Sequence, residues 1–324
     1  MLLDVYSDET FVDNRYIGIG CLFVPHNKKY KLYKKLSNYR CLNTDSKKWV
    51  WNFDECNNFC KEERHKNNNC EIHHTELSKN SSYSRKEISK KWINLLMSNN
   101  KHDQKMIYFK ILYIDLEKLD KNFFGEKDVQ TNIYQRFFRT IVVGGLNYFF
   151  SNKVEIGHIY HDKADAKEQH DFFSWHLGNF IKNDLKRVKI MNKKISFLDS
   201  DHKKYLNHSE EIVVDSHFIQ FIDLILGTVS QTLFNQSSDV EKIKLSTIIY
   251  PLVKELIKNP HDYDNALNYV QKQDISIFPK NQPSSVKDLD EKFRDSRGEF
   301  HRNILLKKPK ILQKNQSLDK WLKK

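Results

Sequence analysis

The sequence predicts an α/β domain in which a mixed sheet is flanked by helices. Two apolar, β-favouring runs at residues 2–10 and 16–24 are separated by a short polar turn, which predicts an N-terminal hairpin. Further along the chain, strand-like runs alternate with segments of helical periodicity, as is typical of α/β domains. The 324 residues are enough for one large domain with an elaboration.

The first strand carries two acids to its end. Its body is apolar and β-favouring through Tyr6, and Asp8 and Glu9 follow before Thr10. A turn stabilised by the Asp8 side chain is the structural alternative to a role in chemistry. Later strands that bring further carboxylates to the same point would favour a metal site instead.

A basic helix and an inserted segment follow the second strand. The spacing of Leu32 and Leu36 predicts a helix over residues 28–40, and its lysines are candidates for phosphate contacts. Residues 41–70 are polar and irregular, so we interpret them as an insertion.

Strands and helices then alternate as far as residue 198. The expected elements are an extended segment over 71–77, a helix from about 84, a strand over 106–114, a helix over 131–150, a strand over 154–162, a helix over 169–185 and a strand over 194–198.

The most unusual predicted helix covers residues 216–234. Nearly every position is apolar, and the few small or polar residues fall along one stripe of the helix, namely Ser216, Gln220, Asp223, Gly227 and Ser230. A buried carboxylate is costly unless it is paired, so Asp223 is expected to meet a cation, a cluster of donors or a metal. The structural alternative is an aspartate satisfied beside Gln220.

Beyond residue 240 the sequence predicts no further strand. Two helical segments end near residues 260 and 272, and residues 301–324 form a basic tail. We therefore divide the chain into a domain over 1–235 and a helical extension with the tail over 236–324.

The charge of the chain favours an acidic partner. Lysine and arginine number 54 against 42 acids, a formal charge of +12, which favours nucleic acid over a membrane surface. A lysine-rich composition inherited from an AT-rich genome is the alternative explanation. We see no apolar run of membrane-spanning length and no signal peptide, and five cysteines fit a reducing compartment, so we expect a cytoplasmic protein.

The strand over residues 154–162 ends in Asp162, and Asp165 follows it. If this strand lies beside the first one, Asp8 and Asp162 project from neighbouring strands and can share a divalent ion. A helix-capping role for Asp162 or Asp165 is the alternative. Glu71 and His73 lie on the same face of an extended segment and Glu76 is close by, so any one of them could complete the site. A solvent-exposed polar position is the alternative for each.

Four pieces of the chain together resemble the domain-of-unknown-function family numbered 3800. They are Ser7-Asp8-Glu9-Thr10, Glu71-Ile72-His73, Tyr160-His161-Asp162, and Val214-Asp215-Ser216 with Gln220, Asp223 and Gly227. The match spans residues 1 to about 235, and its last piece is the most specific. Two departures are Thr10, where Ser is commoner, and Phe11-Val12, where small residues usually follow.

The resemblance implies a ribonuclease-H-like fold and a nuclease that uses Mg²⁺ or Mn²⁺ to cut DNA or RNA, in a setting of anti-phage defence. It implies four acids as metal ligands and catalytic residues, Asp8, Glu71, Asp162 and Asp223. Auxiliary roles fall to Glu9, His73, His161, Asp165 and Gln220. The alternative is a non-catalytic protein of the same fold that binds nucleic acid, or that assembles with a protein partner or a second copy through its C-terminal helices.

A second candidate metal site lies in and beside the insertion. Its thiols and imidazole, from Cys56, Cys60, His65 and Cys70, could hold a structural zinc ion. The spacing contains no Cys-x2-Cys pair, and scattered reduced cysteines are the favoured alternative.

Overall fold

The computed structural model describes residues 1–40, 70–99, 107–125, 129–150, 153–163, 176, 178–179, 181, 188–205, 209–257 and 273–279. Several predictions concern residues outside these ranges: most of the helix over 169–185, the second C-terminal helical segment, the basic tail, Asp165 and the zinc candidates Cys56, Cys60 and His65.

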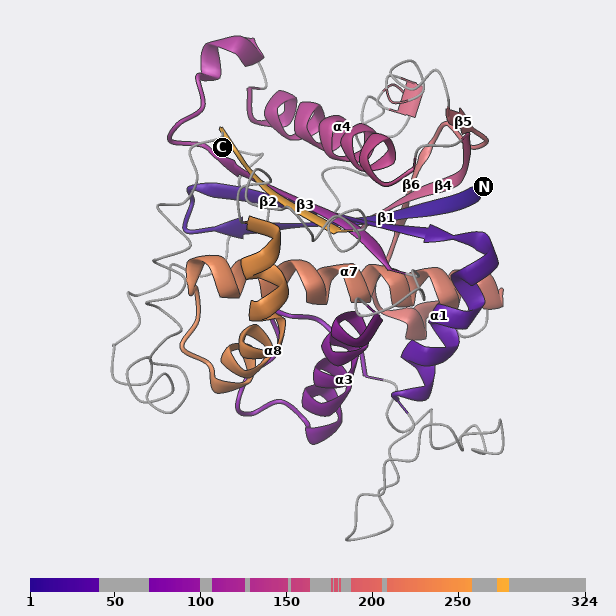
Figure 1. Ribbon diagram of the computed structural model, residues 1–324, viewed down its shortest axis with the longest axis vertical. Coiled ribbons are helices and arrows are strands. Elements are labelled where there is room, and N and C mark those ends of the chain that lie inside the picture. Colours follow the sequence, from indigo (N-terminus) through magenta and orange to yellow (C-terminus); the bar gives the residue numbers. More distant parts are fainter. Residues whose placement is uncertain are drawn as a thin grey trace, which may run out of the picture.

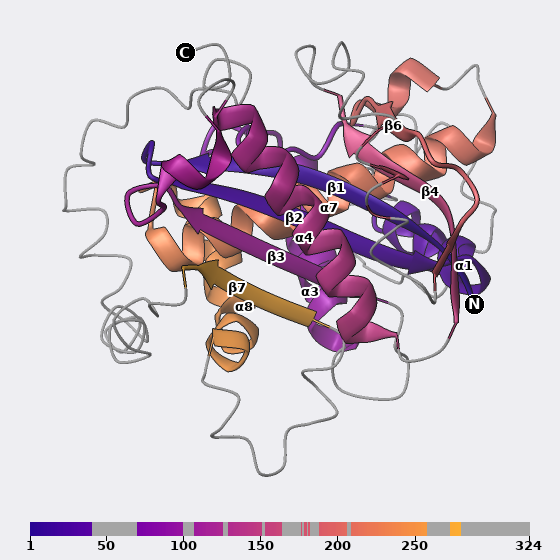
Figure 2. The same ribbon diagram turned by 90° about the horizontal axis from the view of Figure 1, so that it is seen from above.

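The core of the fold is a seven-stranded mixed sheet. Its strands are β1 (Leu2–Val12), β2 (Tyr16–Pro25), β3 (Tyr108–Asp115), β4 (Val154–Asp162), β5 (Val188–Ile190), β6 (Ile195–Leu198) and β7 (Gln273–Phe278), in the order β5-β4-β1-β2-β3-β7. The first three strands form an antiparallel meander, and β4 runs parallel to β1. Both β5 and β6 pair in parallel with β4, and β7 pairs in parallel with β3 (Figure 2). The predicted mixed sheet is confirmed.

Helices cover both faces of the sheet (Figure 1). Helix α4 (Val129–Phe149) lies on one face, and α1 (His26–Asn38), α3 (Tyr83–Asn99), α7 (Glu210–Phe234) and α8 (Val240–Ile257) lie on the other. Each face has its own apolar core. Because side chains alternate along a strand, Leu3 and Val5 of β1 belong to the core beneath α4, whereas Tyr6 belongs to the core around α7.

Helix α7 is the central helix of its layer. By length and composition it is the one helix among the described residues that could cross a membrane, but 83% of its most apolar window is buried. The expectation that no apolar run reaches this length is therefore wrong for α7. The helix also begins at Glu210 rather than at residue 216, because the apolar residues 212–214 are its first turns, with Val214 buried.

The structure corrects two further predictions. Strand β1 continues beyond Thr10 to Val12, and the hairpin turn lies at Asp13 and Asn14, which have positive φ angles of 50° and 54°. Asp8 is therefore inside a strand, so a turn at that residue is ruled out. The expectation that strands stop before residue 240 is also wrong, because β7 extends the sheet beside β3. The predicted division near residue 235 stays a prediction.

Candidate functional site

Asp8 and Asp162 lie on adjacent parallel strands, which meets the condition for the two acids to share a divalent ion. The pairing of β1 with β4 ends at Ser7 and His161, and the two aspartates are the next residues on each strand. Two residues earlier, the rings of Tyr6 and Tyr160 stack with centroids 5.3 Å apart on the face covered by α7. Because side chains alternate, Asp8 and Asp162 point to that same face.

Asp223 of α7 completes a group of three buried or half-buried carboxylates, which we call the acidic cluster: Asp8, Asp162 and Asp223. Burial raises the pKa of Asp8 well above its ordinary value, and the carboxylates of Asp162 and Asp223 raise it further. Burial, Glu9 and Asp223 raise the pKa of Asp162 to about 7. The three strand- and helix-borne acids are thus close enough to repel one another.

Asp223 is held by the segment over residues 70–77. Its Oδ2 accepts the backbone N–H of His74 at 2.7 Å and lies 3.5 Å from Nδ1 of His73. The His74 ring packs directly on Gly227, where a Cβ atom would come within 2.2 Å of the ring Cγ. Gly227 therefore allows this segment to approach α7 closely.

Gln220 joins three parts of the chain one turn earlier on α7. Its Oε1 accepts the Ile72 N–H at 3.0 Å and a hydrogen bond from Arg40 at 2.6 Å, and its Nε2 donates to the Ser200 carbonyl at 2.6 Å. Arg40 also donates to the Cys70 carbonyl at 2.6 Å. Gln220 thus holds the parts of the chain at Arg40, Ile72 and Ser200 against α7.

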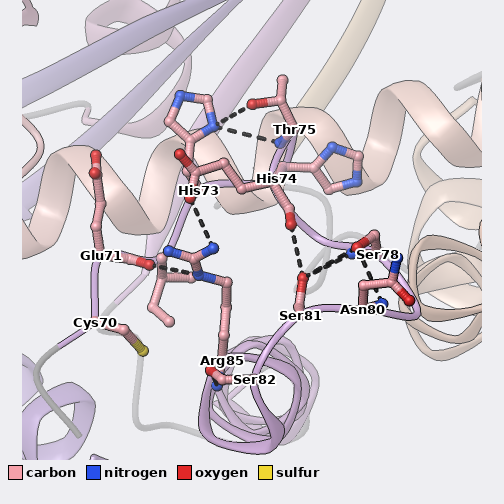
Figure 3. Close-up of polar contacts among 12 residues, drawn as sticks. Cys70, Glu71, His73, His74, Thr75, Ser78, Asn80, Ser81, Ser82 and Arg85 are labelled. Carbon is pink, nitrogen blue, oxygen red and sulfur yellow. Dashed lines mark hydrogen bonds and ion pairs between the residues drawn. The ribbon is translucent and has the colours of Figure 1, made fainter.

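Glu71 lies on the same segment as His73 and is held by Ser200 and Arg85. Its Oε1 accepts a hydrogen bond of 2.6 Å from Ser200, and its carbonyl accepts one of 3.0 Å from Arg85 of α3. Figure 3 shows Glu71 and His73 pointing to the same side, away from α3, as their spacing predicted. The Asp223 carboxylate raises the pKa of His73 against the effect of burial, and Glu71 raises it further.

Glu9 and His161 point to the opposite face of the sheet, beneath α4. The hydroxyl of Tyr134 lies 2.6 Å from Nε2 of His161 and 3.2 Å from Oε2 of Glu9. Nδ1 of His161 lies 2.8 Å from the carbonyl oxygen of Asp162. We call Glu9, Tyr134 and His161 the Tyr134 cluster. Sequence reasoning missed Tyr134, which looks like one more aromatic residue on an apolar helix.

A third group of polar residues lies near the start of β1. It consists of Asp4, Tyr6, Lys29 and Asp215, and we call it the Lys29 network. Lys29 bonds to Asp4 at 2.9 Å and to Asp215 of α7 at 2.6 Å, and Tyr6 donates to Asp215 at 2.5 Å. Burial alone would raise the pKa of Asp4, but Lys29 and His26 lower it overall. Burial raises the pKa of Asp215, although Lys29 and Tyr6 oppose the rise. The predicted phosphate contact is wrong for Lys29, because its side chain is buried in this network.

The donor set of the acidic cluster suits a hard divalent cation. Carboxylate oxygens are the ligands that Mg²⁺ and Mn²⁺ prefer, and a cation would relieve the repulsion that raises the pKa values of Asp8 and Asp162. Within the described ranges, no three histidine, cysteine, aspartate or glutamate side chains are arranged to hold a metal ion. The fit is therefore one of donor chemistry. Of the zinc candidates only Cys70 is described, as a free, half-buried thiol.

Comparisons with known proteins add little. No family model matches the chain. No curated protein matches it either. A structure of the PCNA:RNase HII complex from Archaeoglobus fulgidus is similar at 12% identity, covering 91% of this chain and 90% of that one with a TM-score of 0.29.

Proposed function

We propose that this chain is a divalent-metal-dependent nuclease that hydrolyses phosphodiester bonds of DNA or RNA. The observation that carries the proposal is the acidic cluster. Buried carboxylates that repel one another reduce the stability of a fold, and clustered groups with strongly shifted pKa values mark functional sites. The resemblance to the family numbered 3800 and the excess of basic residues support the same function.

Asp8, Asp162 and Asp223 would hold Mg²⁺ or Mn²⁺, with Glu71 adjacent to them. The bound ions would supply a metal-activated water and stabilise the leaving oxygen of the phosphodiester. His73 lies beside Asp223, and its Nδ1 accepts the Thr75 N–H at 3.3 Å, so a proton is carried on Nε2. That N–H can donate to a phosphate or leaving oxygen without itself holding metal.

Cleavage of labelled substrates tests the proposal. Single-stranded, duplex and RNA–DNA hybrid substrates would be incubated with Mg²⁺, Mn²⁺ or EDTA, using wild type, Asp8→Asn and Asp223→Asn. Asp13→Asn is a matched control, because Asp13 is exposed and its positive φ angle of 50° suits asparagine.

We expect cutting that requires metal, falls by about 1,000-fold or more in the two site variants and is retained in the control. Salt-sensitive binding without cutting would instead identify a non-catalytic nucleic-acid-binding protein. Cutting that both site variants retain would contradict the assignment of the site.

A further inference from the structure

The main-chain pairing that aligns β1 with β4 stops just before the acidic cluster. Its last pair is Ser7 with His161, and the next residues are Asp8 and Asp162. Hydrogen bonds between strands fix the separation of residues only where the strands are paired. Beyond that pair, Asp8 stays paired with Gly20 of β2 and Asp162 with Leu198 of β6, so an interaction between neighbouring side chains is needed to join β1 directly to β4 at this point.

The Tyr134 cluster occupies the place where that interaction is needed. Glu9 follows Asp8 in the chain, and His161 precedes Asp162. The side chains of Glu9 and His161 point to the face of the sheet that α4 covers. There the Tyr134 hydroxyl lies 2.6 Å from His161 and 3.2 Å from Glu9. Tyr134 is 1% exposed and His161 0% exposed, so water does not compete for these contacts.

The hydrogen bonds of His161 extend the connection to the backbone of Asp162. The Asp162 carbonyl can only accept, so Nδ1 of His161 carries the proton in their 2.8 Å contact. Nε2 of the same ring meets Tyr134. The ring thus joins the end of β4 to α4, and the contact of Tyr134 with Glu9 joins α4 to β1. Tyr134 also lies against a direct contact between the strands, in which Nε2 of His161 is 3.3 Å from Oε2 of Glu9.

We propose that Tyr134 is a positioning residue that sets the spacing of Asp8 and Asp162 for metal binding. The inference rests on the proposed function. Metal sites tolerate errors of only about 0.5 Å in ligand position, and loss of a residue that orients the ligands typically weakens metal affinity about 10- to 100-fold. Tyr134 does not touch the metal or the substrate; it acts through the residues next to the two ligands.

The test compares Tyr134→Phe with Tyr113→Phe. Both changes remove one hydroxyl from a buried tyrosine. Tyr113 lies on the α7 face, where its hydroxyl is 2.8 Å from Ser230. Mn²⁺ affinity would be measured on the full chain by the loss of the free-ion electron paramagnetic resonance signal, beside cleavage rates over a range of Mn²⁺ concentrations and thermal melting.

We expect Tyr134→Phe to weaken Mn²⁺ binding at least 10-fold and to shift the metal dependence of cleavage to higher concentration, while Tyr113→Phe keeps wild-type affinity. Equal Mn²⁺ affinities in the two variants would overturn the inference alone. Unfolding of Tyr134→Phe with a folded Tyr113→Phe would also overturn it, because the hydroxyl would then hold the fold rather than the site. Absence of Mn²⁺ binding and of cleavage in the wild type would overturn the proposed function itself.

Discussion

Two carboxylates on the same buried face of one strand, Asp4 and Asp8, have opposite electrostatic surroundings. Both lie in β1 and face α7, and each meets an aspartate of that helix within its own group. Between Asp4 and Asp215 the chain places Lys29, at 2.9 Å and 2.6 Å. Around Asp8 it places further carboxylates instead.

The difference distinguishes acids that the fold itself compensates from acids that it leaves to repel one another. The pKa of Asp4 is lowered by Lys29 and His26 against the effect of burial, whereas burial and Asp162 raise the pKa of Asp8. A paired acid is compensated by the fold itself. A group of repelling acids persists only where something outside the chain compensates it, and a divalent cation is the simplest such partner.

The largest effect should come from removing the cation of the Lys29 network. Lys29→Met leaves Asp4 and Asp215 buried without a positive charge, so we expect a loss of about 3–5 kcal/mol in the free energy of unfolding at pH 7. Urea denaturation measures it. Lys31→Met, at an exposed position of the same helix, should change stability by no more than about 0.5 kcal/mol. Similar losses in the two variants would contradict the structural role of Lys29.

Beside the acidic cluster, Gly227→Ala should displace the segment over residues 70–77, which holds Asp223. A Cβ atom at this position comes within 2.2 Å of the His74 ring, so we expect a loss of about 1–3 kcal/mol together with reduced cleavage. Gly144→Ala in α4 is the control, because its Cβ meets only the Lys110 side chain at 3.4 Å. That variant should be neutral or stabilised by up to about 1 kcal/mol. Thermal melting and cleavage assays would distinguish the two.

Lowering the pH should reduce the cost of Lys29→Met. In the wild type the folded pKa of Asp4 is lowered, so its contribution to stability is present above pH 4 and is lost as the pH falls through the folded value. In the variant Asp4 and Asp215 lose the cation that opposes the effect of burial, so protonating these carboxylates as the pH falls recovers stability. The gap between the two proteins should narrow by about 1–2 kcal/mol from pH 7 to pH 4. A constant gap in urea titrations would attribute the cost to lost packing of the lysine stem.

The smallest expected change in stability comes from Asp8→Asn, and its sign is the informative part. In EDTA at pH 7, Asp8→Asn should stabilise the protein by about 1 kcal/mol, because it removes one of the repelling charges. Asp4→Asn should destabilise it, because Lys29 loses a partner. Added Mg²⁺ should raise the melting temperature of the wild type but not of Asp8→Asn. Destabilisation by both substitutions in EDTA would remove the distinction between the two ends of β1.

Much of the fold could be predicted from local pattern. The hairpin and β4 were predicted because apolar, β-favouring runs with clear ends need no distant partner to be recognised. The strand β7 was missed because Gln273–Phe278 is short and directly follows a segment predicted to be helical. Its identity as a strand comes from parallel pairing with β3, a contact between distant parts of the sequence.

Part of the candidate site could also be predicted from local sequence pattern. Strand ends and helix spacing are enough to select Asp8, Asp162 and Asp223, which the structure brings together. The burial of Lys29 could not be read from a run of lysines, since it requires Asp215 to arrive from α7. Tyr134 requires knowledge of which side chains cross to the α4 face. Asp4 was a missed signal, because an acid within an apolar strand already indicates a buried pair.

The contacts of the Arg40 side chain affect where the sequence of this protein can be lengthened or shortened. It bonds to the Cys70 carbonyl at 2.6 Å and to Gln220 at 2.6 Å, and its guanidinium carbon lies 4.9 Å from the centroid of the Trp92 ring. The two ends of segment 41–69 are therefore held together by residues of the core. Entropy of loop closure depends only weakly on the length of a loop whose ends are fixed. Sequence between Arg40 and Cys70 can therefore be exchanged or extended, by evolution or by protein engineering, while α7 keeps Asp223 in place.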